Sequence, residues 1–225
     1  EIATVFVGHF AVGFGLKLTT PAVSLGFLFF AAQFIDLLWP TLLLLGLEHV
    51  EISPGITAVV PLDFVSYPIS HSLLAVCGWA VLVGGGYGLW RRQWLSAAVC
   101  GGAVLSHWLL DLITHRPDLP LAPGGEIRVG LGLWSSLPAT LVVELGLFAI
   151  GVTLYARATR ALGRKGSLGL WGLVGFLLLV HMGNLFGPPP PSVQAIAISG
   201  HAQWLLVLWA WWLDRHRVAR STDSA

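Results

Sequence analysis

Seven apolar stretches, each close to the length that a helix needs to cross a lipid bilayer, follow one another along the chain. A spanning helix takes about 20 mostly apolar residues. The stretches lie near residues 2–16, 22–47, 70–90, 94–115, 134–157, 168–187 and 196–214. Only 10% of all residues are charged, against roughly 25% in an ordinary soluble domain. The pattern predicts an all-α, polytopic transmembrane helix bundle of about six to seven spans, forming a single integral membrane domain over residues 1–225.

Two of the seven stretches depart from the usual length. The first, 2–16, is short for a span, whereas the second, 22–47, is long and contains Pro40, which predicts a kink or a tilt. The chain begins EIATVFVGHF, without a basic segment, so we expect no cleavable signal peptide in it.

The basic residues gather at one set of helix ends. With seven spans, ten of the 12 Lys and Arg residues share one side: Lys17, Arg91, Arg92, Arg157, Arg160, Arg164, Lys165, Arg215, Arg217 and Arg220. The other side, which includes the segments 48–69 and 116–133, holds Arg116 and Arg128. Because cytoplasmic segments are enriched in Lys and Arg, we predict that the N-terminus lies outside and the C-terminus in the cytoplasm. Most histidines then fall toward the outer side.

One helix carries a column of ionisable side chains. His107, Asp111 and His115 recur at every fourth residue and therefore share a helix face. An ionisable group inside a bilayer costs several kcal/mol unless it is paired, hydrated or bound to a metal. Imidazole and carboxylate groups are ligands of Zn²⁺ and Mn²⁺. The column predicts a metal site; the alternatives are a hydrogen-bond network at the helix end and, for His115, a place beside the ligands or at the surface.

Three further residues are candidate ligands. Asp36 lies in an otherwise apolar stretch. If it does not bind a metal, we expect its carboxyl group to be protonated and hydrogen-bonded to a neighbouring helix. His71 stands at a helix start directly after Ser70, and His9 lies in a Gly-rich segment that can pack closely. For both histidines the alternative is a structural role.

Acidic residues near these candidates suggest proton acceptors. Asp63 precedes His71 in the outer segment, and Glu144 lies inside the fifth stretch, so we name both as candidate catalytic bases. We expect Glu48 and Glu51 to belong to a solvated acidic loop. The chain has no nucleotide-binding glycine loop and no nucleophile elbow, and its basic residues flank spans. We therefore expect no nucleic-acid partner.

Four pieces of sequence, taken in order, resemble a known family. They are GHFAVGF, QFIDLLWP, SHSLL and HWLLDLITH. With them the chain resembles the membrane-bound metal-dependent hydrolases regulated by the LexA repressor, which are uncharacterised bacterial integral membrane proteins. The resemblance covers residues 1 to about 118, and 134–214 match only as three further spans. It implies a location in the bacterial inner (cytoplasmic) membrane and a metal site formed by His9, Asp36, His71, His107 and Asp111.

Two functions follow as expectations. The first is a membrane-embedded hydrolase that uses a divalent metal, Zn or Mn, near the outer leaflet and acts on a lipid-linked ester or phosphoester. The second is a non-catalytic accessory or assembly subunit of a larger membrane complex, or a small transporter, whose histidines bind a pigment, a haem or a partner or relay protons. Membrane lipids are partners in both cases, and other proteins of a membrane complex in the second.

Overall fold

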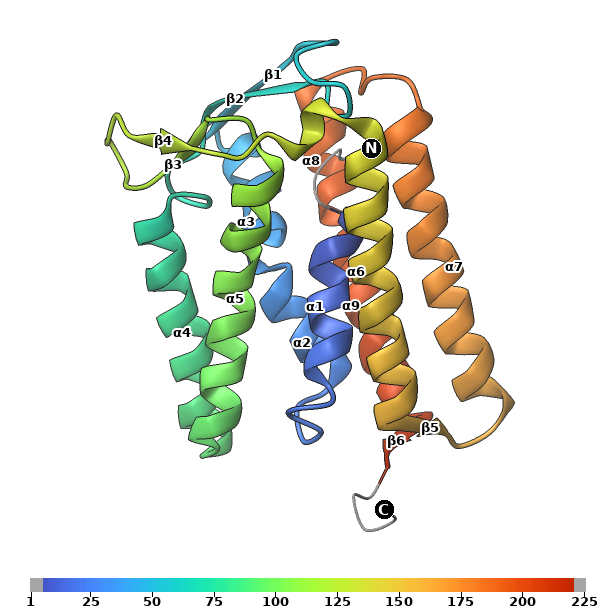
Figure 1. Cartoon of the computed structure of the whole chain (residues 1–225). Helices are drawn as coiled ribbons and strands as arrows, with labels where there is room; N and C mark the ends of the chain where they lie inside the picture. The colour runs from blue at the N-terminus through green and yellow to red at the C-terminus, as the bar shows by residue number, and fades with distance from the viewer. Residues whose placement is uncertain (1–5, 221–225) are drawn as a thin grey trace.

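Helices running in alternating directions along one axis make up most of the structure, a computed structural model that describes residues 6–220 (Figure 1). The α-helices are α1 Phe6–Leu16, α2 Leu25–Ala32, α3 Phe34–Leu44, α4 Leu73–Arg91, α5 Trp94–Thr114, α6 Leu137–Ala158, α7 Arg164–Phe186, α8 Val193–His201 and α9 Gln203–Asp214. A short 3-10 helix, Leu133–Ser135, precedes α6. The predicted all-α bundle is confirmed.

Among the described residues, five helical segments are long and apolar enough to cross a membrane. They are α4, α5, α6, α7 and the combined α8–α9 segment, Val193–Asp214. The pair α2 and α3 makes a sixth if it is counted as one bent span. The protein is therefore a multi-pass membrane protein. Helix α1 has 11 residues and is shorter than a span; residues 2–5 of the predicted first segment lie outside the described residues.

Short β-hairpins cover one end of the bundle (Figure 1). They pair β1 His49–Ile52 with β2 Leu62–Ser66 and β3 Leu119–Pro120 with β4 Arg128–Val129. At the opposite end, β5 Thr159–Ala161 pairs with β6 Arg217–Ala219. The hairpin end holds the segments that the charge pattern predicts to face outside, and the opposite end carries the basic cluster.

The bend in the second predicted span does not occur at its proline. Helices α2 and α3 meet at Gln33 with an angle of 54°, whereas Pro40 lies inside α3. The kink predicted at Pro40 is therefore in the wrong place. Carbonyl groups in the last turn of a helix have no partner within it, so the break at Gln33 leaves the carbonyl of Ala32, at the end of α2, available to another helix.

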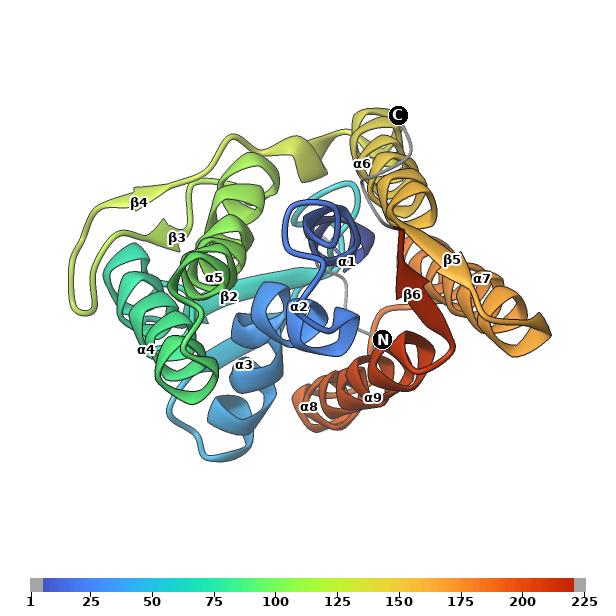
Figure 2. The ribbon, with the colours of Figure 1, turned by 90° about the horizontal axis from the view of Figure 1, so that it is seen from below.

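The short helix α1 lies in the middle of the bundle, surrounded by α2, α5 and α6 (Figure 2). It approaches α6 closely, because a Cβ atom added at Gly151 would lie 2.8 Å from the Cα atom of Ala11. The backbone N–H groups of the first turn of α1, at Phe6, Val7 and Gly8, act as donors to the carboxylate of Glu144. That carboxylate supplies acceptors which a helix start needs where the bilayer offers no water.

The two halves of the chain are packed together. Helix α1 contacts α6, α2 contacts α9, and α3 contacts α8. The helices that carry the candidate ligands are therefore supported by helices from the second half of the chain.

Candidate metal centre

Five of the six predicted ligands lie together in the interior of the bundle. His9 comes from α1, Asp36 from α3, and His107 and Asp111 from α5, while His71 lies just before α4. None of the five is more than 3% exposed. The helix rotations that the sequence leaves open thus bring residues from distant parts of the chain to one place.

Four of these side chains have ligand atoms at similar spacings. The Nε2 atom of His71 lies 3.6 Å from Oδ1 of Asp36 and 3.8 Å from Oδ2 of Asp111. The Nε2 atom of His107 lies 3.6 Å and 3.5 Å from the same two oxygens. Ligand bonds of about 2.1 Å in a tetrahedral zinc site place neighbouring ligand atoms about 3.4 Å apart. Each of the four histidine–aspartate pairs is therefore spaced like neighbouring ligands of one ion. The ligand atoms of Asp36, His71 and His107 in addition all lie within 4.8 Å of one another.

The other ring nitrogen of both histidines is occupied. Nδ1 of His107 lies 2.9 Å from the carbonyl oxygen of Ala32, which the break between α2 and α3 exposes. Nδ1 of His71 lies 2.7 Å from the hydroxyl of Ser70. A neutral imidazole has one N–H and one lone pair. If Nδ1 donates in both rings, each Nε2 lone pair points toward the two carboxylates, as a metal-binding histidine requires.

The hydroxyl of Ser70 is held in turn by Glu48. It donates to Oε2 of Glu48 at 2.5 Å, and the backbone N–H groups of Ile69 and Ser70 donate to Oε1 at 2.7 and 2.8 Å. Glu48 is 1% exposed, so its interpretation as part of a solvated loop is wrong. The sequence missed this residue because the β1–β2 hairpin, rather than local spacing, brings it to Ser70.

His9 lies beside these four residues with a different orientation. Its ring stacks on that of His107, with centroids 3.7 Å apart and planes 5° from parallel. Its Nε2 lies 3.3 Å from Oδ1 of Asp111, and these three residues form a second group with ligand-like spacing. Since imidazole lone pairs lie in the ring plane, two parallel stacked rings cannot both point at one ion. His9 therefore adjoins the first group, with its Nε2 facing Asp111.

His115 does not join either group. Helix α5 ends at Thr114, and His115 has extended backbone angles, so its side chain leaves the column. Its Nδ1 lies 3.0 Å from Oδ1 of Asp118, and its ring packs on Trp134. Burial alone would raise the pKa of Asp118, but hydrogen bonds led by that of His115 lower it below its ordinary value.

The two predicted proton acceptors also lie outside both groups. Asp63 forms an ion pair with Arg116, and both side chains are about one-third exposed at the outer end. Glu144 is buried, binds the first turn of α1, and has its Oε2 3.7 Å from Nδ1 of His181.

Comparison with protein-family models, with curated proteins and with solved structures found no significant match to this chain. What the fold and the site define is a multi-pass helical membrane protein with a buried histidine–aspartate cluster whose residues could hold a metal ion.

Proposed function

We propose that the protein is a membrane-embedded metal-dependent hydrolase whose centre binds one divalent ion through Asp36, His71, His107 and Asp111. The observation that carries the proposal is that two histidine nitrogens each lie 3.5–3.8 Å from the same two aspartate oxygens. Such separations are too long for good hydrogen bonds. Nε2 of His107 and Oδ2 of Asp111 have no hydrogen-bond partner, and buried polar atoms in that state are costly unless something binds them.

The donor set favours zinc, with manganese second. A set of two imidazole nitrogens and two carboxylate oxygens suits Zn²⁺. A divalent ion held in this way supplies Lewis-acid activation of water and of a carbonyl or phosphoryl oxygen.

Among the chain's own residues, we assign proton transfer to His9. Neither of its ring nitrogens has a hydrogen-bond partner, although Nε2 faces Asp111. We prefer it to Asp63, which is paired with Arg116, and to Glu144, which binds the first turn of α1. General bases must lie within reach of the proton they accept, and of these three only His9 adjoins the centre.

The substrate class follows from position. His71 precedes the first turn of α4 and Asp111 lies in the last turn of α5, so both are near the hairpin end, which we assign to the outer side of a bacterial inner membrane. A lipid-linked ester or phosphoester of the outer leaflet is the substrate class that fits this depth. The sequence resemblance to the LexA-regulated family supports the location in the inner membrane, whereas the substrate class rests on depth alone.

The burial of the centre favours a second candidate function. Every proposed ligand is at most 3% exposed, as in structural metal sites that are closed to solvent. In that case the ion fastens α3 and α5 to the start of α4, and the protein serves as an accessory or assembly subunit of a membrane complex.

Metal content tests the site. Protein purified in detergent is compared with His107→Ala and Asp111→Asn by inductively coupled plasma mass spectrometry. We expect about one ion per chain, lost in both variants and kept in His201→Ala, whose ring bonds to Thr41 and Ala197 away from the centre. Elution as a single species on size exclusion separates ligand loss from misfolding. An absence of metal in folded wild-type protein after addition of Zn²⁺ and Mn²⁺ would overturn the proposal.

Activity separates the two candidate functions. Metal-loaded protein is screened against acyl and phosphoryl esters of lipids, before and after treatment with a chelator. Hydrolysis that disappears with the metal and returns with it supports the hydrolase. Stoichiometric metal without turnover of any ester supports the structural ion.

A further inference from the structure

A groove in the membrane-facing surface lies between α7 and α9, apart from the metal centre. It has a volume of about 360 Å³, within the range of small-molecule sites of roughly 300–1,000 Å³. Its walls are mainly apolar and include Phe176 and Val180 of α7, Leu206 and Trp209 of α9, and Phe6 of α1. An apolar chain fits such walls.

The groove also contains a polar group that needs a partner. Gln203 lines it and is 4% exposed, and neither its amide nitrogen nor its amide oxygen has a hydrogen-bond partner. Leaving a buried amide unpaired costs about 1–3 kcal/mol. A ligand that offers both a donor and an acceptor at this point would satisfy it.

The depth of Gln203 limits the kind of ligand. Ten residues separate it from Val193 at the outer start of α8, or about 15 Å along the helix. This is about half of the roughly 30 Å hydrocarbon thickness, well below the headgroups. A charged phosphate at that depth would need cationic partners, and the residues lining the groove include no charged side chain.

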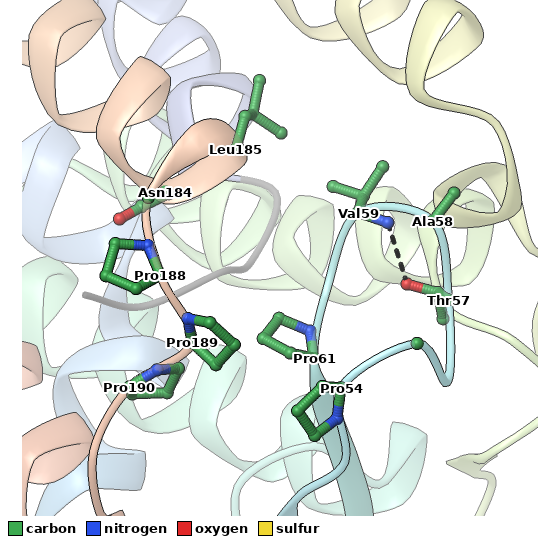
Figure 3. Close-up of a pocket in the computed structure, with 12 residues that line it drawn as sticks. Pro54, Thr57, Ala58, Val59, Pro61, Asn184, Leu185, Pro188, Pro189 and Pro190 are labelled. Carbon is green, nitrogen blue, oxygen red and sulfur yellow. Dashed lines mark hydrogen bonds between the residues drawn. The ribbon is translucent and has the colours of Figure 1, made fainter.

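The groove adjoins a cleft at the outer end through Asn184, which lines both. In this cleft Pro188, Pro189 and Pro190 of the α7–α8 connection face Pro54 and Pro61 of the β1–β2 connection (Figure 3). The cleft has a volume of about 160 Å³ and likewise no charged lining residue. Neither the groove nor the cleft therefore offers an ion-pair partner to a charged lipid headgroup.

We propose that this groove is a binding site for an uncharged acyl glycerolipid of the diacylglycerol type. Its acyl chain lies against Phe176 and Trp209, and its hydroxyl and ester oxygens pair with the amide of Gln203. The site does not depend on the assignment of the metal centre.

The test uses a diacylglycerol with a photoactivatable acyl chain, incorporated with the purified protein into phosphatidylethanolamine vesicles. We expect peptide mapping to find adducts concentrated around Phe176 and Trp209. Ala202→Trp fills the groove from an exposed lining position and should reduce this labelling about tenfold, equivalent to a loss of roughly 1.4 kcal/mol. The matched control, Ala149→Trp, places the same side chain at an exposed position on α6 and should leave labelling unchanged.

A second variant and a second probe keep the result decisive. Gln203→Leu retains the size of the side chain but removes the amide, so it should abolish the preference for diacylglycerol over a phosphatidylethanolamine probe. Equal labelling of the groove by both probes in the wild type, or adducts spread evenly over all membrane-facing helices, would show surrounding lipid only and overturn the proposal. Groove residues left unlabelled by every probe would also overturn it. Unchanged metal content in each variant confirms that the two sites are being tested separately.

Discussion

Replacing Glu48 by Gln should reverse a chain of hydrogen bonds and thereby weaken metal binding without removing a ligand. In the native protein, the carboxylate can only accept, so Ser70 donates to it and is left to accept from Nδ1–H of His71. A glutamine whose oxygen keeps the two backbone N–H bonds presents its NH₂ group to Ser70. Ser70 then donates to Nδ1 of His71, which moves the ring proton to Nε2, the atom that faces Asp36 and Asp111.

The expected magnitude follows from this proton shift. Substitutions of groups that orient metal-binding histidines weaken metal affinity about 10–100-fold, which corresponds to roughly 1.4–2.7 kcal/mol. In the absence of metal, Glu48→Gln should lower the free energy of unfolding by less than Glu48→Ala does. Alanine would leave two buried N–H groups and a hydroxyl unpaired, at about 1–3 kcal/mol each.

Zinc affinity is measured by competition with a chromophoric chelator in detergent, together with thermal unfolding in the absence of metal. Glu51→Gln makes the same chemical change on the exposed side of β1 and should retain native affinity. If Glu48→Gln protein is folded and binds zinc as tightly as the wild type, the hydrogen-bond chain does not set the orientation of His71.

Two further predictions concern stability. Gly151→Ala places a Cβ atom 2.8 Å from the Cα atom of Ala11, so α1 must shift. We expect the free energy of unfolding to fall by about 1–3 kcal/mol and the unfolding temperature to fall with it. The control Gly146→Ala has open space around the added Cβ atom and should show no such loss of stability. The lowered pKa of Asp118 means that its carboxylate, which bonds to His115, stabilises the fold above about pH 4 and that this contribution is lost as the pH falls further. Unfolding measured against pH should therefore depend less on acid in Asp118→Asn than in the wild type, and equal curves would contradict this.

Helical periodicity predicted the part of the centre that one helix contributes. His107 and Asp111 are four residues apart and do face the same interior space. The same rule placed His115 with them, but α5 ends one residue too early. Pro117 limits how far the helix can continue, since a proline disfavours helical geometry at the preceding residue, Arg116, and helices usually end at or before that position. Residues at every fourth position share a face only while the helix continues, so the prediction fails for a residue beyond the helix end.

The parts of the centre contributed by other elements depend on features that the sequence does not show. Asp36 follows the break at Gln33, and its direction depends on a bend of 54° that the pattern assigned to Pro40 instead. The orientation of His71 depends on Glu48, 23 residues earlier, through a hairpin in a segment interpreted as loop. Hydropathy and charge gave the depth of each residue but not the rotation of its helix.

The buried carboxylates differ in which groups donate hydrogen bonds to them. This difference distinguishes their roles better than their depth in the membrane does. Glu48 and Glu144 receive backbone N–H groups, from the segment before α4 and from the first turn of α1, so their charge already has donors. Asp111 instead faces the Nε2 atoms of His9, His71 and His107 at 3.3–3.8 Å. Two of those rings have Nδ1 positioned to donate elsewhere, so in their neutral form their Nε2 atoms offer lone pairs. A carboxylate that faces lone pairs needs a cation beside it. The same reasoning that removes Glu144 from the catalytic residues therefore places Asp111 at the centre.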